Sequence, residues 1–144
     1  MSPEPNSTET LDETIRVLQP SHWPQPKGYA NGISAKGRLV VTGGTIGWDP
    51  VTGILPDGFL AQARQCLDNI LVILAEAEAE PHHLIRMTWY VVDIETYLAN
   101  LKGLAEIYRE SIGRHFPAMA LVQVVRLVES RAELEIEATA VVPE

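Results

Sequence analysis

Residues 116–142, FPAMALVQVVRLVESRAELEIEATAVV, contain two runs of alternating sequence that decide the predicted fold. Side chains alternate with a period of two along Ala118–Leu127, and three glutamates alternate with apolar residues along Glu133–Val142. This period, together with the β-branched residues in both runs, indicates β-strands. The polar break at residues 128–132 is short enough for a hairpin with a longer loop. The stretch therefore predicts a closing β-hairpin.

Two helical patterns and a strand precede this stretch. Apolar residues follow helical spacing over residues 58–80, with Asp57 as the predicted N-cap and a proline directly after the pattern. The apolar run at residues 84–92 predicts a strand, and a second helix is predicted over residues 95–112, capped by Asp93. These segments place both helices before the closing hairpin.

The N-terminal part predicts an edge strand and a second hairpin. Residues 15–18 form a short apolar run that ends before a proline, and residues 29–35 and 39–42 flank a Lys-Gly turn. The polar, acidic residues 1–13 predict a disordered tail, which leaves residues 14–144 as a single domain. The element order predicts an α+β fold in which two helices pack on a largely antiparallel sheet.

Composition excludes several classes of protein. The net charge of −8 would repel a phosphate backbone, so nucleic acid is not an expected partner. The chain has no apolar run of about 20 residues, so no membrane partner is expected. Cys66, the single cysteine, cannot form an internal disulfide and is predicted to be a small core residue rather than a catalytic thiol. With no signal-peptide pattern, these features predict a cytoplasmic protein.

The histidines do not form a metal motif. His82 and His83 are adjacent and would project apart, whereas His22 and His115 are isolated in the sequence. Because there is no H-x-x-x-H spacing and no cysteine pair, neither a metal nor another cofactor is expected.

Two features leave their function open at this stage. The glycine-rich segment Gly43–Gly53 is neither a Walker loop nor a G-x-G-x-x-G motif, and a tight strand exit is the simpler interpretation over a ligand-binding loop. Glu133, Glu135 and Glu137 share one face of the last predicted strand. They could form a solvated outer face, or one of them could transfer protons in a cleft.

Four segments together carry a resemblance to a known family. They are Gly28-Tyr29, the Val-x-Gly-Gly-x-Ile…Asp-Pro-x-x-Gly segment 41–53, the Gln-x-x-x-x-Leu-x-Asn-Ile segment 62–70, and the closing pattern 117–141. In this order and spacing they resemble the reactive intermediate deaminase family (Rid or YjgF, endoribonuclease L-PSP-like). The resemblance extends over residues 29–142.

The resemblance implies a quaternary structure that the sequence pattern alone does not reveal. It implies a chorismate-mutase-like (bacillar) two-layer sandwich, with a mostly antiparallel mixed sheet and two helices. It also implies a homotrimer whose sheets form a central β-barrel, with small-molecule substrates bound in clefts between neighbouring subunits. Such a trimer would explain why both faces of the strand predicted at residues 118–125 are apolar.

One departure from the family affects the expected substrate. Well-studied members hydrolyse enamines and imines to a 2-keto acid and ammonia, and in them an arginine after Pro-Ala binds the substrate carboxylate. Met119 holds that position here, followed by Ala120 and Leu121. The resemblance therefore implies an enamine or imine deaminase, a hydrolase, whose specificity is altered by Met119. Candidate replacement cations are Lys27, Arg86, Arg126 and His22.

The resemblance also assigns roles to individual residues. Glu135 matches the glutamate that positions or activates water and is the predicted catalytic residue. The predicted substrate-binding residues are Tyr29, Gly43, Gly44, Thr45, Met119 and Leu121. Two other functions remain open: a non-catalytic trimer that binds small molecules, and an endoribonuclease, which the acidic charge disfavours.

Overall fold

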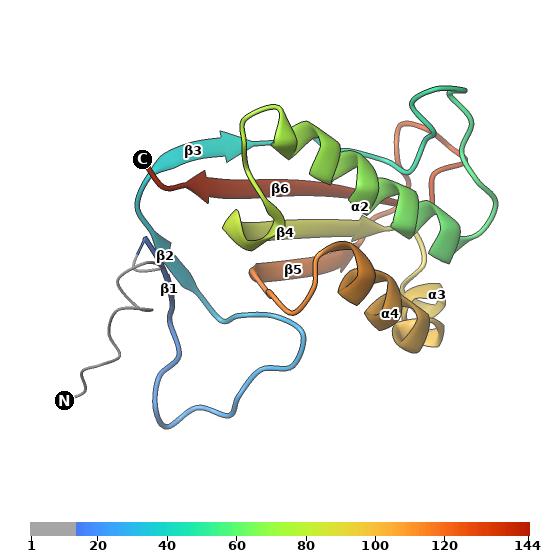
Figure 1. Cartoon of the computed structure of the whole chain (residues 1–144). Helices are drawn as coiled ribbons and strands as arrows, with labels where there is room; N and C mark the ends of the chain where they lie inside the picture. The colour runs from blue at the N-terminus through green and yellow to red at the C-terminus, as the bar shows by residue number, and fades with distance from the viewer. Residues whose placement is uncertain (1–13) are drawn as a thin grey trace.

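The computed structural model describes residues 14–144 and contains a four-stranded mixed sheet (Figure 1). Its strands, in spatial order, are β3 (Arg38–Val41), β6 (Leu134–Val142), β4 (Leu84–Val91) and β5 (Ala118–Gln123). β6 is antiparallel to both of its neighbours, whereas β4 and β5 are parallel. The predicted α+β class and mostly antiparallel mixed sheet are therefore confirmed.

The predicted closing hairpin is wrong, although both of its strands exist. β4 lies between β5 and β6, so the two strands that follow one another in sequence are not neighbours in the sheet. β5 ends at Gln123 rather than Leu127, which leaves residues 124–133 to pass the end of β4. β4 and β6 hold the two inner positions of the sheet, so each of them pairs along both of its edges.

A second, two-stranded sheet lies near the start of the described chain. β1 (Ile15–Val17) pairs antiparallel with β2 (Ile33–Ala35), which confirms the short strand predicted there. The hairpin predicted between residues 29–35 and 39–42 is wrong, because β3 pairs all four of its residues with the end of β6 instead. The disorder predicted for residues 1–13 concerns a segment outside the described residues.

The helices lie together on one face of the large sheet. α2 (Phe59–Ala75) contacts both β6 and α4 (Leu101–Ser111), and Figure 1 shows it running across β6 and β4. The second predicted helix is divided at Asn100 into α3 (Ile94–Ala99) and α4. Asp93 caps α3 as predicted, because its Oδ1 accepts the Glu95 N–H at 2.9 Å. The described helices include none that is long and apolar enough to cross a membrane.

Both predicted ends of α2 need correction. Gly58, not Asp57, occupies the N-cap position, and no side chain caps the first turn. The helix ends at Ala75 rather than Glu80, since Glu78 has a positive φ of 59° and the Ala79 N–H bonds back to the Leu74 carbonyl. This turn returns Ala79 to the core before the short 3₁₀ helix η1 (Pro81–His83) begins. Burial of Ala79 explains the early end better than the proline that follows.

The hydrophobic core lies between the sheet and the helices. Side chains of α2 and α4 pack against alternate residues of β4 and β6. The fully buried members include Leu67, Ile70, Leu74, Met87, Val91, Leu134 and Ile136. The intervening residues of β4 and β6 face the other side of the sheet, which the helices leave uncovered. The two faces of the sheet therefore offer different chemical surroundings.

Candidate functional site

The predicted site residues fall into two groups on opposite faces of the sheet. Glu135 is paired across the strands with Tyr90, and Leu121 is paired with Trp89. Trp89 is buried beneath the helices, and successive residues of a strand point to opposite faces. Glu135 therefore faces away from the helices. Leu121, and with it Met119 two residues earlier, faces toward them and packs against the core.

The first group contains the glycine segment and the glutamate. A methyl group added at Gly44 would overlap Oε2 of Glu135, so the carboxylate lies directly against the backbone there. Thr45, the next residue, exchanges two hydrogen bonds with Ile136: its N–H donates at 2.8 Å and its carbonyl accepts at 2.9 Å. The structure thus brings Gly43, Gly44 and Thr45 beside a half-buried Glu135.

Helix α2 holds this glycine segment in position. The Cys66 thiol donates to the Thr45 carbonyl at 2.9 Å, and the Asn69 amide donates to the carbonyls of Ile46 and Trp48 at 3.2 and 2.8 Å. Burial raises the pKa of Cys66 to about 12, so the thiol stays protonated and is not a nucleophile at neutral pH. The predicted core role of Cys66 is confirmed, with a positioning bond that the sequence did not reveal.

Gln62 secures the loops around the same strand. Its amide donates to the carbonyls of Pro56 and Arg131 at 3.1 and 3.2 Å, and its oxygen accepts the Glu133 N–H at 2.8 Å. A methyl group at Gly47 would overlap the Gln62 backbone, which shows how closely the glycine segment approaches α2. Gln62 and Asn69 belong to the segment that carries the family resemblance, but sequence reasoning assigned them no role.

Polar groups surround Glu135 on the outer face of the sheet. Partial desolvation and the neighbouring Glu137 carboxylate raise the pKa of Tyr90, and Glu135 acts in the same direction. Arg86, a candidate cation, opposes this shift and lies on this face rather than with Met119. The Tyr90 hydroxyl, like that of any tyrosine at neutral pH, is a neutral hydrogen-bond donor, and it lies near these carboxylates.

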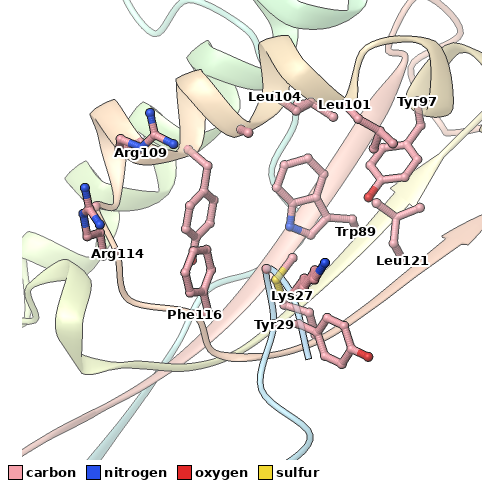
Figure 2. A pocket seen from close by; sticks show the side chains of 15 residues that line it. Lys27, Tyr29, Trp89, Tyr97, Leu101, Leu104, Arg109, Arg114, Phe116 and Leu121 are labelled. Atoms are coloured by element: carbon pink, nitrogen blue, oxygen red, sulfur yellow. The ribbon is translucent and has the colours of Figure 1, made fainter. Parts of the chain in front are cut away.

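The second group lines a pocket of about 630 Å³ on the helix side of the sheet (Figure 2). Tyr29, Met119 and Leu121 all contribute to its wall, so three of the predicted substrate-binding residues do come together. The lining comes from the loop before β2, the strands β4 and β5, the helices α3 and α4, and the turn that follows α4. Its aromatic residues are Tyr29, Trp89, Tyr97, Tyr108 and Phe116.

The cations of this pocket differ from those expected. Of the four predicted candidates, only Lys27 lines it, and Arg109 and Arg114 are present instead. Sequence reasoning missed these two arginines because they come from the end of α4 and the turn after it, far from the matched motifs. Within residues 14–144, no group of three or more histidine, cysteine or acidic side chains could hold a metal ion.

Comparison with known proteins identifies the family. Residues 22–142 match the family described as Endoribonuclease L-PSP. The chain is 34% identical, over 78% of its length and 86% of the relative's, to the 2-iminobutanoate/2-iminopropanoate deaminase of Escherichia coli K12. It is 36% identical, over 73% and 80% of the two chains, to a RutC family protein of Haemophilus influenzae. The chain belongs to the Rid (YjgF, endoribonuclease L-PSP) family.

Solved structures of other Rid proteins share the fold. The Rid family protein YyfB of Yersinia pestis superposes with a TM-score of 0.79 at 28% identity, covering 90% of this chain and 99% of the other. The YjgF gene product of E. coli gives a TM-score of 0.66 at 34% identity, covering 78% and 87%. The α+β architecture of this Rid protein is therefore that of its family.

Proposed function

We propose that this Rid protein is a homotrimeric deaminase that hydrolyses an enamine or imine to a carbonyl compound and ammonia. One observation carries the proposal: a half-buried carboxylate, Glu135, lies directly against the backbone of Gly44. The relationship to an iminobutanoate deaminase at 34% identity supports the reaction class. A carboxylate held beside a glycine segment can bind a water molecule and exchange protons with a small substrate.

Glu135 would serve as both base and acid in this mechanism. It accepts a proton from water while the water oxygen forms a bond to the imine carbon, and it passes this proton to the nitrogen, which gives a neutral carbinolamine. Glu135 then takes the proton of the carbinolamine hydroxyl and delivers it to the amino nitrogen as the C–N bond breaks, so that the carbonyl forms and ammonia leaves. The reaction consumes one water and needs no oxidant or reductant. Tyr90, whose hydroxyl is protonated at neutral pH, can donate a hydrogen bond on the same face.

A second copy of the chain is required to complete such a site. Glu135 and the pocket around Met119 lie on opposite faces of one sheet, so a single copy cannot present both to one substrate. The outer face also exposes apolar side chains that need a partner: Leu39, Val41 and Val122 are 66%, 63% and 44% exposed. A homotrimer with its sheets facing inward would cover these residues and bring Glu135 of one subunit to the pocket of the next.

We propose further that Met119 alters the specificity of the enzyme. The methionine offers no charge to a substrate carboxylate at the position where the family resemblance implies an arginine. Small imino acids, which have few other groups to bind, should therefore be poor substrates. This is the expected difference from the related iminobutanoate deaminase of E. coli.

A non-catalytic binding protein is the second candidate function. The observation that favours it is the apolar character of the pocket at Met119 and Leu121, without a charged side chain at the family's arginine position. In that case the trimer would bind carbonyl compounds in the cleft and release them unchanged.

Turnover measurements with a panel of imines test the proposal. Imines would be generated in situ from amino acids, and ammonia release would be compared with the spontaneous rate. We expect acceleration of at least one imine and a loss of roughly 100-fold or more in Glu135→Gln. Glu137→Gln, an exposed glutamate on the same face, is the matched control and should keep its activity.

Three outcomes would contradict the proposal. Failure to accelerate any imine, combined with thermal stabilisation by keto acids, would support the binding protein instead. Cleavage of RNA by the purified protein, with nuclease-free controls, would support a ribonuclease. A monomer by light scattering during size-exclusion chromatography would remove the composite site.

A further inference from the structure

We infer that the pocket beneath α4 binds an aromatic 2-oxo or 2-imino acid whose ring carries a hydrogen-bond acceptor. The ring would lie against Trp89 and the aromatic wall, and the carboxylate would lie at a rim formed by Lys27, Arg109 and Arg114. Turnover of this acid as a substrate depends on the proposed function, whereas its binding in the pocket does not. The family relationship suggests a 2-imino acid, whereas the aromatic ring and its hydrogen-bond acceptor are inferred from the side chains that line this pocket.

The wall of the pocket is flat and apolar. Tyr108 and Phe116 stack with their ring centroids 5.4 Å apart and an angle of 9° between the planes. The Tyr108 hydroxyl is already used, because it donates to the His115 carbonyl at 2.6 Å. The stacked pair therefore offers ring surface rather than a polar group. Leu104 and Leu121 extend the apolar lining, which suits a planar hydrocarbon ring.

The size of the pocket agrees with a ligand larger than a short-chain acid. About 630 Å³ lies within the roughly 300–1,000 Å³ typical of sites for drug-sized molecules. A three-carbon imino acid would leave most of the apolar wall in contact with water. An aromatic side chain on the ligand would cover that wall and gain the free energy of its burial.

A buried donor without an acceptor belongs to one of the side chains that line the pocket. In the part of the chain that the structure describes, Trp89 Nε1 is the buried side-chain nitrogen that has no hydrogen-bond partner. Trp89 is 4% exposed, and Figure 2 shows its nitrogen edge turned toward the side of the pocket where Phe116 lies. Leaving such a donor unpaired is unfavourable, so an acceptor on the ligand would be selected. The flexible side chain of Met119, which shares this lining, can move to admit it.

Positive charge gathers at the rim, although the chain as a whole carries −8. Figure 2 shows Arg109 and Arg114 on the same side of the pocket, with Lys27 nearer to Trp89. Within residues 14–144, none of these three cations forms a salt bridge. An anion at the rim would therefore have no protein carboxylate to displace, and guanidinium binds a carboxylate through two parallel hydrogen bonds.

The binding test uses stable keto acids, which are products of the proposed reaction and are not turned over. Calorimetric titration would compare 4-hydroxyphenylpyruvate, phenylpyruvate and pyruvate. We expect phenylpyruvate to bind at least tenfold more tightly than pyruvate, and the hydroxylated acid to bind roughly tenfold more tightly again because its oxygen accepts from Trp89. Pyruvate binding as tightly as phenylpyruvate would overturn the inference.

Variants locate the binding in this pocket. Ala105 lines the pocket from an exposed position of α4, so Ala105→Trp should fill the pocket without disturbing the core and should abolish binding. Glu106→Trp, at the next exposed position outside the lining, should bind normally. Trp89→Phe should remove the preference for the hydroxylated acid. Arg114→Gln should weaken the binding of both aromatic acids. Unchanged binding in Ala105→Trp would overturn the inference, as would a preserved preference in Trp89→Phe.

The inference and the proposed function fail in different ways. Tight binding of the aromatic acids, without hydrolysis of any imine, would refute the deaminase and leave the pocket assignment standing. Hydrolysis of small imines, without binding of aromatic acids, would leave the deaminase standing and refute the pocket assignment. If Trp89→Phe does not fold, the comparison of the three acids with the wild-type protein still tests the pocket assignment.

Discussion

Replacing Gln62 with methionine should destabilise the protein by about 2–4 kcal/mol. Gln62 is 3% exposed, and its side chain bonds to three backbone groups: the carbonyls of Pro56 and Arg131 and the N–H of Glu133. Methionine has a similar length and shape, so the substitution removes these bonds without leaving a large cavity.

The magnitude follows from the surroundings of the three groups. A buried polar group left without a partner costs about 1–3 kcal/mol. Arg131 is exposed and Pro56 is half-buried, so their carbonyls can regain part of the lost bonding from water. The N–H of Glu133, the residue directly before β6, lies in a half-buried residue and should contribute most. The expected loss in the free energy of unfolding is therefore well below the total for three fully unpaired buried groups.

Urea unfolding followed by tryptophan fluorescence measures this effect. Protomer concentration must be equal for all variants, because association stabilises the folded state by mass action. Gln65→Met is the matched control, since Gln65 is half-buried on the same helix and makes one side-chain bond, to Asn69 at 2.9 Å. The control should lose less than about 1 kcal/mol. A loss in Gln62→Met no larger than that of the control would refute the reasoning.

Three further predictions concern the glycine segment, the buried thiol and a helix cap. Gly44→Ala should displace the Glu135 carboxylate and reduce ammonia release at least tenfold, and an unchanged rate in this variant would contradict the assigned contact. Burial raises the pKa of Cys66 from 9.0 to about 12, so the folded protein keeps this proton when the unfolded chain has lost it. The free energy of unfolding should therefore fall as the pH rises from 9 toward 12, and Cys66→Ala should flatten that decline in urea titrations. Asp93→Ala removes the cap of α3 and should lower the free energy of unfolding by about 1 kcal/mol, and a change below about 0.3 kcal/mol would contradict that role.

Local features of the fold were predictable from the sequence, whereas strand pairing was not. The strand predicted at residues 84–92 is found at Leu84–Val91, because an apolar run between turn signals is a local property. The hairpin at residues 116–142 was wrong because nothing in two consecutive strands reveals that β4 will lie between them. The early end of α2 depends on the burial of Ala79, which is a tertiary contact.

The candidate site was only half predictable for the same reason. The resemblance identified Glu135 and Gly44, which the structure places in contact, and Met119, which it places on the opposite face. Which face of the sheet Glu135 and Met119 occupy follows from the register of β4, β5 and β6. No single segment of the sequence contains that information. Arg109 and Arg114 reach the pocket from helix α4 and its following turn, so the spacing of motifs on the strands could not indicate them.

Complementation between two inactive variants tests the composite site most directly. Glu135→Gln lacks the proposed catalytic carboxylate but keeps its pocket, and Ala105→Trp keeps the carboxylate but has a filled pocket. The variants would be mixed in equal amounts in urea and refolded together, with each variant refolded alone as its control. If neighbouring copies share the site, random mixing should restore about a quarter of the wild-type activity, since one boundary in four then joins an intact pocket to an intact Glu135. If the mixture is no more active than the two variants refolded separately, Glu135 and the pocket do not act together across a subunit boundary, and the account is contradicted.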